Sequence, residues 1–408
     1  MTEDPRLRRA RGALGFCFLA QGVAFALLVT RIPAIQDRYG ISDALLPAFL
    51  AAVPVLAGAG SIAAGRLVRS AGPAAVLRWS QPLVLLSLIG VGAGRTLGHA
   101  AAALAVFGLA VGALDASMNM LGVGLQHAYG RSIMLGFHAA YSLGGIAGAS
   151  AAWAAAHWHL GLPATYLAAA AVLLPGILAA GPLHTGRRHT PPPTGGTPQD
   201  APRAGGFRPL LPLCAVMTCA YIGDATVSNW SAKYVQDVLG GSEQLATLPY
   251  NLYMATTLAG RAAGDLGVRR FGAAAVVRAG TVLAAAGFAV VAAAPGPWTG
   301  MAGFTLLGLG LCVIVPQTFA AAGRLYPRSS DAAVARLNIF NYAGFLIGSP
   351  LVGALGDAWS HRGAMLVPAA LVLVTLLYAR SFGSSGALYG VPHEQPRVGD
   401  VGRGRDRL

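Results

Sequence analysis

Long apolar runs, separated by short polar segments, make up most of the sequence. A helix that crosses a bilayer needs about 20 mostly apolar residues, and twelve runs meet this requirement: 12–33, 43–67, 74–94, 99–125, 133–156, 162–183, 209–232, 244–266, 273–294, 298–322, 333–356 and 363–382. Runs this long are expected to be helical, because helices satisfy every backbone polar group within lipid. The pattern therefore predicts an all-α membrane protein with twelve transmembrane helices.

The composition agrees with a membrane protein and argues against a soluble enzyme. Of the 408 residues, 55% are hydrophobic and 11% are charged, whereas a soluble domain carries about 25% charged residues. The sequence contains no phosphate-binding loop and no histidine or cysteine spacing typical of a metal site. We therefore expect no enzymatic activity, no cofactor and no metal ion.

The basic residues account for the net charge of +14 and indicate how the chain is oriented. They lie between the apolar runs, where membrane orientation explains them better than nucleic-acid binding does. If the N-terminus is inside, most basic residues face the cytoplasm, and the outer loops hold a small remainder: Arg31, Arg38, Arg95, Lys233 and Arg362. Both termini are therefore expected in the cytoplasm.

One connection is much longer than the others and divides the chain. Residues 184–208 are rich in proline, glycine and arginine, a composition typical of a flexible linker. The sequence thus predicts an N-terminal six-helix half (1–183), a cytoplasmic linker (184–208) and a C-terminal six-helix half (209–382). The polar remainder, 383–408, is predicted to be a disordered cytoplasmic tail.

The two halves carry a repeat at an offset of 200 residues. Residues 60–78 and 260–278 are identical at nine of 19 positions, and Gln36-Asp37 recurs as Gln236-Asp237. Six predicted spans separate the copies, and an even number places both halves in the membrane in the same orientation. The repeat therefore predicts two parallel, pseudo-symmetric halves.

Parallel six-helix halves joined by a cytoplasmic linker resemble the major facilitator superfamily (MFS) of transporters. The loop between the second and third spans in that family reads Gly-x-Leu-x-Asp-Arg-x-Gly, followed by basic residues. This chain matches the pattern at Gly65, Leu67 and Gly72, with Arg78 after them. The second copy of the loop provides Asp265, Arg269, Gly272 and Arg278.

Arg69 occupies the position at which the family has an aspartate, and Arg269 does so in the second copy. In the family that acid helps to latch the two halves together. Arg261, Asp265 and Arg269 follow one another at spacings of four on one helix face, so a ladder of ion pairs is one replacement for the latch. The alternative is that these arginines are solvated at the membrane surface and only fix the topology.

Two acids are predicted to lie within the membrane. Asp115 falls in the fourth span and Asp224 in the seventh, and a carboxylate at that depth is costly unless it faces a cavity or a partner. Asn119 lies one turn after Asp115 on the same helix face. Because burial disfavours the charged form of a carboxyl group, either acid is a candidate proton carrier. The alternative is a protonated acid that is hydrogen-bonded to a neighbouring helix.

Further polar residues follow the same helices. His138 and Tyr141 share a face of the fifth span, and Gly144 and Gly148 form a strip of small residues for close helix packing. His138 either binds substrate or relays protons, or else forms a helix–helix hydrogen bond. The other candidates for the substrate site are Asn229 and Trp230, which follow Asp224, and Asn338 and Asn341 in the eleventh span.

Within the superfamily, residues 115–119 are similar to an acid-x-x-x-Asn element of fucose-permease-like proton symporters, and residues 137–145 are similar to the fifth span of that group and of related uncharacterised bacterial inner-membrane permeases. The resemblance implies that Asp115 takes part in proton coupling and that Asn119 and His138 line a sugar site. The first span lacks the acid that those symporters carry, so a relay of two acids is not implied.

These features predict a proton-coupled secondary transporter in the bacterial cell membrane, a permease or symporter for a small polar solute, with a sugar-like solute as the candidate. A proton-antiport exporter of drugs or metabolites is the alternative, although the fifth span lacks the proline of the Gly-Pro signature usual in drug antiporters. A membrane receptor that does not transport is the third reading. We expect the partners to be the solute, protons and lipid, with no nucleic acid, and we expect a monomer.

Overall fold

The computed structural model describes residues 4–42, 45–183, 207–242, 245, 248–327 and 329–383. Nearly all of the predicted linker and of the predicted tail lies outside these residues. At the end of the predicted linker, Arg208–Leu210 forms the short 3-10 helix η3.

The first six long helices lie close to the first six predicted spans. They are α1 (Pro5–Thr30), α3 (Leu46–Ala71), α4 (Pro73–Ala93), α5 (Leu97–Tyr129), α6 (Met134–His157) and α7 (Leu162–Ala180). A short helix that was not predicted, α2 (Ile32–Tyr39), follows α1, and the 3-10 helix η1 (Gly181–Leu183) follows α7. We call α1 to α7 the first bundle.

The second bundle, α8 to α16, repeats this order. It contains α8 (Leu211–Lys233), α10 (Leu248–Phe271), α11 (Ala273–Ala293), α12 (Pro297–Leu311), α13 (Ile314–Leu325), α14 (Ser330–Ala358), α15 (His361–Ala364) and α16 (Leu366–Leu377). A π-helical turn, η4 (Tyr234–Val238), follows α8, and a 3-10 helix, η5 (Ala379–Phe382), follows α16. Within the described residues, nine helical runs are long and apolar enough to cross a membrane. Two other long helices, α6 of the first bundle and α10 of the second, are not among these nine. These two helices contact each other.

The tenth predicted span, 298–322, is interrupted between α12 and α13. Pro316 has no N–H, so the carbonyl of Cys312, four residues earlier, lacks its usual helical partner. That carbonyl accepts a hydrogen bond from Nε of Arg261 at 3.4 Å. The break therefore places a backbone acceptor beside a charged side chain of α10.

Close helix packing recurs at equivalent glycines in the two bundles. A Cβ atom on Gly144 of α6 would collide with the carbonyl oxygen of Leu19 on α1, and a Cβ atom on Gly344 of α14 would lie 2.5 Å from that of Thr218 on α8. Gly148 meets Val23 of α1 in the same way. The predicted strip of small residues is therefore confirmed, and both bundles use it.

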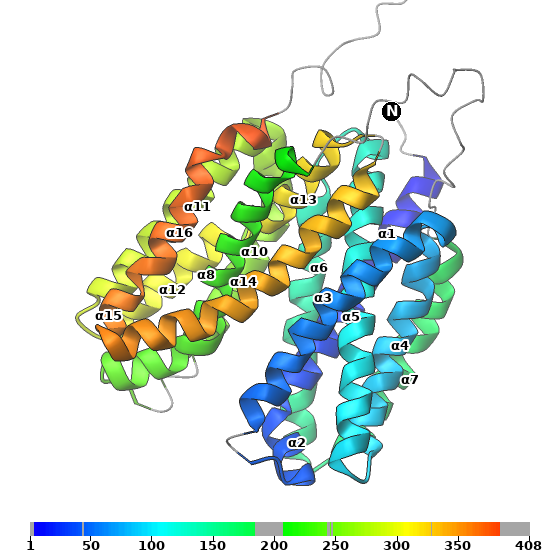
Figure 1. The fold of residues 1–408 in the computed structure, drawn as a ribbon, viewed down its shortest axis with the longest axis horizontal. Coiled ribbons are helices and arrows are strands. Elements are labelled where there is room, and N and C mark those ends of the chain that lie inside the picture. Colours follow the sequence, from blue (N-terminus) through cyan, green and yellow to red (C-terminus); the bar gives the residue numbers. More distant parts are fainter. Residues whose placement is uncertain are drawn as a thin grey trace, which may run out of the picture.

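Figure 1 shows the two bundles side by side, the first on the right and the second on the left. The N-terminus lies at the upper end, and α2 and α15 lie at the lower ends of their bundles. The bundles contact each other through α3 with α14, α6 with α10, and α5 with α14. Several of the polar side chains described below lie in these contacts.

Candidate functional site

Asp115, on α5, accepts hydrogen bonds from both bundles. Its Oδ1 atom accepts from Nδ2 of Asn119, one turn further along the helix, at 3.4 Å. Its Oδ2 atom accepts from Nδ2 of Asn341 and from the hydroxyl of Tyr342, each at 3.1 Å, and both of these residues belong to α14. An ionised carboxylate only accepts hydrogen bonds, so it suits all three donors at once. The predicted proton carrier thus lies where the bundles meet.

A chain of hydrogen bonds continues from Asp115 to α3. Nδ2 of Asn341 also lies 3.1 Å from Oδ1 of Asn338, and Nδ2 of Asn338 donates to Oγ of Ser61 at 3.2 Å. Ser61 and Asn338 are completely buried, where hydrogen bonds are electrostatically stronger than in water. We call Ser61 and Asp115, with Asn338, Asn341 and Tyr342 opposite them, the asparagine contact.

Asp224, the other predicted acid, lies on α8 and is hydrogen-bonded within its own bundle. The hydroxyl of Tyr253, on α10, donates to its Oδ1 atom. Tyr141 of the first bundle and Tyr221 of the second each interact electrostatically with both Asp115 and Asp224. The two acids therefore share one polar region, in which a tyrosine hydroxyl donates to each carboxylate.

Arg261, on α10, joins the two bundles. It was not among the residues predicted to bind substrate or carry protons. Its Nη1 atom donates to Oγ of Ser142 on α6 at 2.7 Å, in addition to the hydrogen bond with Cys312. A charge within a membrane-spanning helix is itself a signal of function. The sequence contained that signal, but Arg261 was interpreted only as a member of the ladder with Asp265 and Arg269.

Asp265 and Arg269, further along α10, bind the start of α6. The Asp265 carboxylate accepts from the Ser132 hydroxyl at 2.5 Å and from the N–H of Gly136 at 2.9 Å. Arg269 donates to the carbonyl of Ser132 at 2.8 and 3.2 Å. A carboxylate is favoured at this place because the N-terminus of a helix carries partial positive charge. We call the three α10 side chains, with Ser132, Gly136 and Ser142, the arginine contact.

The ladder within α10, one of the two alternatives for these residues, is not formed. Over the described residues no ion pair joins Arg261, Asp265 and Arg269, and each of them bonds to the first bundle instead. The first copy of the loop makes a different contact. Gly65 lies against Ala335 of α14, whose Cβ atom is 3.2 Å from the position of a Cβ on the glycine, and Arg69 is exposed.

The loop glycines shape the tight connections that follow α3 and α10. Gly72 has φ 80° and ψ 158°, and Gly272 has φ 82° and ψ 154°, a left-handed φ that favours glycine. Arg78, on α4, donates from Nε to the carbonyl of Gly181 at 2.8 Å, while Arg278 is exposed. The repeat therefore preserves the backbone of this loop more faithfully than the contacts of its arginines.

His138 is packed between aromatic rings of the two bundles. Its ring lies 5.4 Å from that of Phe18 on α1 and 6.3 Å from that of Phe319 on α13. The side chain is buried, and its Nε2 atom has no hydrogen-bond partner within the described part of the chain. In this arrangement the histidine contributes to packing where the bundles are closed together.

Asn229 and Trp230 are not brought into the asparagine contact. Asn229 is exposed and donates to the carbonyl of Ala225 in its own helix at 3.0 Å. Trp230 donates from Nε1 to the carbonyl of Ser349 at 3.1 Å, and its ring lies 6.2 Å from that of His361. Trp230 therefore packs α8 against α14.

Four tyrosines of the polar region were not predicted. They are Tyr221, Tyr250, Tyr253 and Tyr342; besides the contacts given above, Tyr250 interacts with Asp224. Tyrosines within apolar runs are common as interfacial anchors, so the pattern singles none of them out. The position of Tyr342 directly after Asn341 was the available signal.

Comparison with known sequences gives the family of this chain. A sequence model of the Major Facilitator Superfamily matches residues 213–398. An uncharacterized MFS-type transporter of Yersinia pestis is 30% identical over 373 residues, covering 89% of this chain and 93% of that protein. An uncharacterized transporter of Sinorhizobium fredii is 29% identical, covering 85% and 90%. The membrane protein MosC of Rhizobium meliloti is 26% identical, covering 87% and 85%.

Solved structures show the same fold at lower sequence identity. The MFS transporter FucP in its outward conformation has a TM-score of 0.78 at 18% identity, covering 92% of this chain and 99% of that one. The human organic anion transporter MFSD10 has a TM-score of 0.74 at 15% identity, covering 92% and 100%. The predicted all-α MFS fold is therefore confirmed. The chain belongs to the major facilitator superfamily, as a multi-pass secondary transporter and not an enzyme.

Proposed function

We propose that the protein is a proton-coupled transporter of a small, polar, sugar-like solute, with Asp115 as the proton carrier. The observation that carries this proposal is that Asp115, on the first bundle, is hydrogen-bonded by Asn341 and Tyr342 of the second. The charge state of one carboxyl group is thereby linked to the contact between the two bundles.

The link follows from the chemistry of the carboxyl group. Ionised Asp115 accepts hydrogen bonds from every donor around it, whereas the protonated form has one O–H donor and a reduced capacity to accept. Protonation therefore weakens the bonds to Asn341 and Tyr342, and with them the asparagine contact. A proton and the relative position of the bundles are coupled in this way, as proton-driven alternating access requires.

The orientation supports a state that is closed towards the cytoplasm. Figure 1 shows the two bundles meeting at the upper end, where the N-terminus lies, and separating towards α2 and α15. The distribution of arginines favours the upper end as the cytoplasmic side. The likeness to FucP in its outward conformation agrees with this assignment. On this proposal both termini are cytoplasmic.

The solute is proposed to bind in the polar region around the two acids. Tyr141, Tyr221 and Tyr250 offer ring faces and hydroxyl groups, and Asp224 offers a carboxylate, a combination suited to a hydroxyl-rich ligand. Asn119, Asn338 and Asn341 hold Asp115 and are proposed to position the proton carrier. His138 is proposed to reach solute once its packing with Phe319 opens.

The test uses the full chain in sealed, right-side-out vesicles, with a panel of sugars and hydrophobic cations. Asp115→Asn keeps the side-chain shape but cannot carry a proton, so uphill transport is expected to be abolished while exchange of solute remains measurable. Asp237→Asn, at an exposed acid paired with Lys233, is the control and should transport normally. Uphill transport that is unchanged in Asp115→Asn would remove Asp115 from the mechanism.

The sign of the pH change separates uptake from export. Alkalinisation outside the vesicles on addition of solute is expected for symport, because protons enter with the solute. Acidification outside would instead identify a proton-antiport exporter. If no member of the panel moves protons or exchanges, the sugar-like substrate class is wrong.

A further inference from the structure

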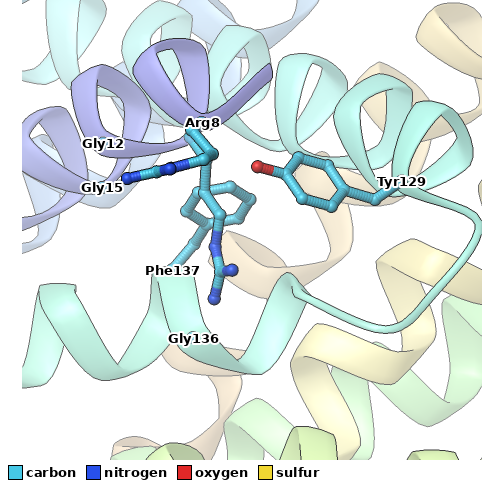
Figure 2. Close-up of a pocket in the computed structure, with 7 residues that line it drawn as sticks. Arg8, Gly12, Gly15, Tyr129, Gly136 and Phe137 are labelled. Atoms are coloured by element: carbon cyan, nitrogen blue, oxygen red, sulfur yellow. The ribbon is translucent and has the colours of Figure 1, made fainter. Parts of the chain in front are cut away.

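A hollow of about 360 Å³ opens at the N-terminal end of α1, bounded by the end of α5 and the start of α6 (Figure 2). Arg8, Arg11, Gly12 and Gly15 line it from α1, Tyr129 from α5, and Gly136 and Phe137 from α6. This volume falls at the lower end of the range for small-molecule sites. From its lining we propose that the hollow binds a phosphate group.

The hollow is cationic. Arg8 and Arg11 both line it, no acid does so, and neither arginine forms an ion pair over the described residues. The Arg11 guanidinium lies 5.8 Å from the centre of the Tyr129 ring, and that of Arg131 lies 5.6 Å from it. Stacking on a ring holds a guanidinium in place while its N–H groups point outwards. The guanidinium groups of Arg8 and Arg11, which line the hollow, match the oxygen geometry of phosphate.

The Tyr129 hydroxyl supports a ligand in the same place. It is buried and has no hydrogen-bond partner within the described chain, which is a costly state for a polar group. Figure 2 shows this hydroxyl pointing across the hollow towards Arg8. An oxygen atom of a bound phosphate would accept a hydrogen bond from the Tyr129 hydroxyl and so provide the missing partner.

The α1 wall leaves room for the ligand. Apart from the adjoining residues and backbone of α1 itself, no atom lies within 4 Å of the position that a Cβ would take on Gly12 or on Gly15. A side chain added at either glycine therefore extends into open space and reduces the free volume without meeting neighbouring backbone. A larger residue at one of these glycines can therefore fill the hollow and test independently whether phosphate binds there.

The carboxylate of Asp265 lies close to Gly136, one of the residues that line the hollow. The position of a Cβ on Gly136 would lie 3.4 Å from Oδ2 of Asp265 and 3.8 Å from Nη2 of Arg11. Asp265 is already bonded to Ser132 and to the Gly136 N–H. One acid cannot neutralise both Arg8 and Arg11, so the lining keeps a net positive charge.

The hollow is separate from the proposed transport site. Tyr129 follows Asp115 by 14 residues on the same helix, a distance of about 21 Å along the axis. A phosphate group could reach this end of the bundle on a soluble solute or on the headgroup of an anionic lipid. The experiment distinguishes these two sources.

The test titrates inorganic phosphate into the full-length protein in phosphatidylcholine nanodiscs at constant ionic strength, with chloride as the reference anion. Calorimetry gives the affinity, and the thermal midpoint in chloride confirms that each variant is folded. Phosphate is expected to bind, and Arg8→Gln and Arg11→Gln are each expected to weaken binding about tenfold, because each loses charge-assisted hydrogen bonds. Arg6→Gln, an equal change of charge at an exposed residue of the same helix that does not line the hollow, should leave the affinity unchanged.

Two further variants test the geometry. Tyr129→Phe keeps the ring for stacking but removes the hydroxyl, and about a fivefold loss of phosphate affinity is expected. Gly15→Val should abolish binding by filling the hollow. An equal loss with Arg6→Gln, or full affinity in Gly15→Val, would show that phosphate responds only to surface charge and would overturn the proposal.

Nanodiscs that contain phosphatidylglycerol identify the source. If the lipid headgroup occupies the hollow, phosphatidylglycerol should lower the apparent phosphate affinity in the unmodified protein. If the ligand is soluble, phosphate should bind equally in both lipids. Absence of phosphate binding in phosphatidylcholine, together with no stabilisation by phosphatidylglycerol that depends on Arg8 and Arg11, would refute the site.

Discussion

The asparagine contact and the arginine contact come from equivalent helices of the repeat, but they use different side chains. Ser61 on α3 corresponds to Arg261 on α10, and Gly65 corresponds to Asp265. On the α14 side, Asn338 and an amide network meet Ser61, whereas α6 offers hydroxyl and backbone groups to the charges of α10. Duplication has kept the helix pairing and changed its chemistry.

This difference assigns the two contacts different roles in the proposed transport cycle. The asparagine contact includes Asp115 and therefore responds to a proton. The arginine contact is a set of charge-assisted hydrogen bonds that includes neither Asp115 nor its donors. In the proposed cycle, opening requires both contacts to break, and the transported proton is placed on Asp115 of the asparagine contact.

The largest effect is expected from Asp265→Ala in the arginine contact. The change leaves the Ser132 hydroxyl and the Gly136 N–H without their acceptor, and hydrogen bonds to a charged group contribute about 1.5–3 kcal/mol each. The population in which the bundles are closed is expected to fall at least about a hundredfold relative to the open one. Spin labels at Arg66→Cys and Arg336→Cys, both exposed, report the distance between α3 and α14. Asp37→Ala, at an exposed acid of α2, should leave the distances unchanged; an equal response in both variants would refute a specific role for Asp265.

A smaller and unequal effect is expected when the equivalent positions Arg261 and Ser61 are compared. Arg261→Ser places in α10 the residue that α3 has, and it removes a charged donor to Ser142, so the closed population should fall about tenfold. Ser61→Ala removes one neutral hydrogen bond from Asn338, worth about 1 kcal/mol, or about fivefold. The same label pair measures both variants. A larger effect of Ser61→Ala would reverse the assigned roles.

Much of the fold could be predicted because each membrane span corresponds to one continuous apolar run in the sequence. The bends are less local: the break before Pro316 was missed because the run 298–322 is apolar throughout, and α2 is too short and polar to register as a span. The repeat could be detected in the sequence partly because both copies keep a glycine, Gly72 and Gly272, where the backbone has a left-handed φ.

The site was only partly predictable, because its contacts join helices far apart in the chain. Asp115, Asn119 and Asn341 stood out as polar residues in apolar runs, and the structure brings them together. Nothing in the spacing shows that Asp115 meets Tyr342, or that Asp265 reaches across to α6 instead of pairing with Arg261. Those facts depend on which helices are neighbours.

The most direct test of the central claim, that the charge on Asp115 controls closure, is the distance between labels at Arg66→Cys and Arg336→Cys as a function of pH. With Asp115 present, acidification is expected to increase the separated population, because protonation weakens the bonds to Asn341 and Tyr342. With Asp115→Asn added, the distances should no longer depend on pH. An unchanged pH response in that variant would contradict the account.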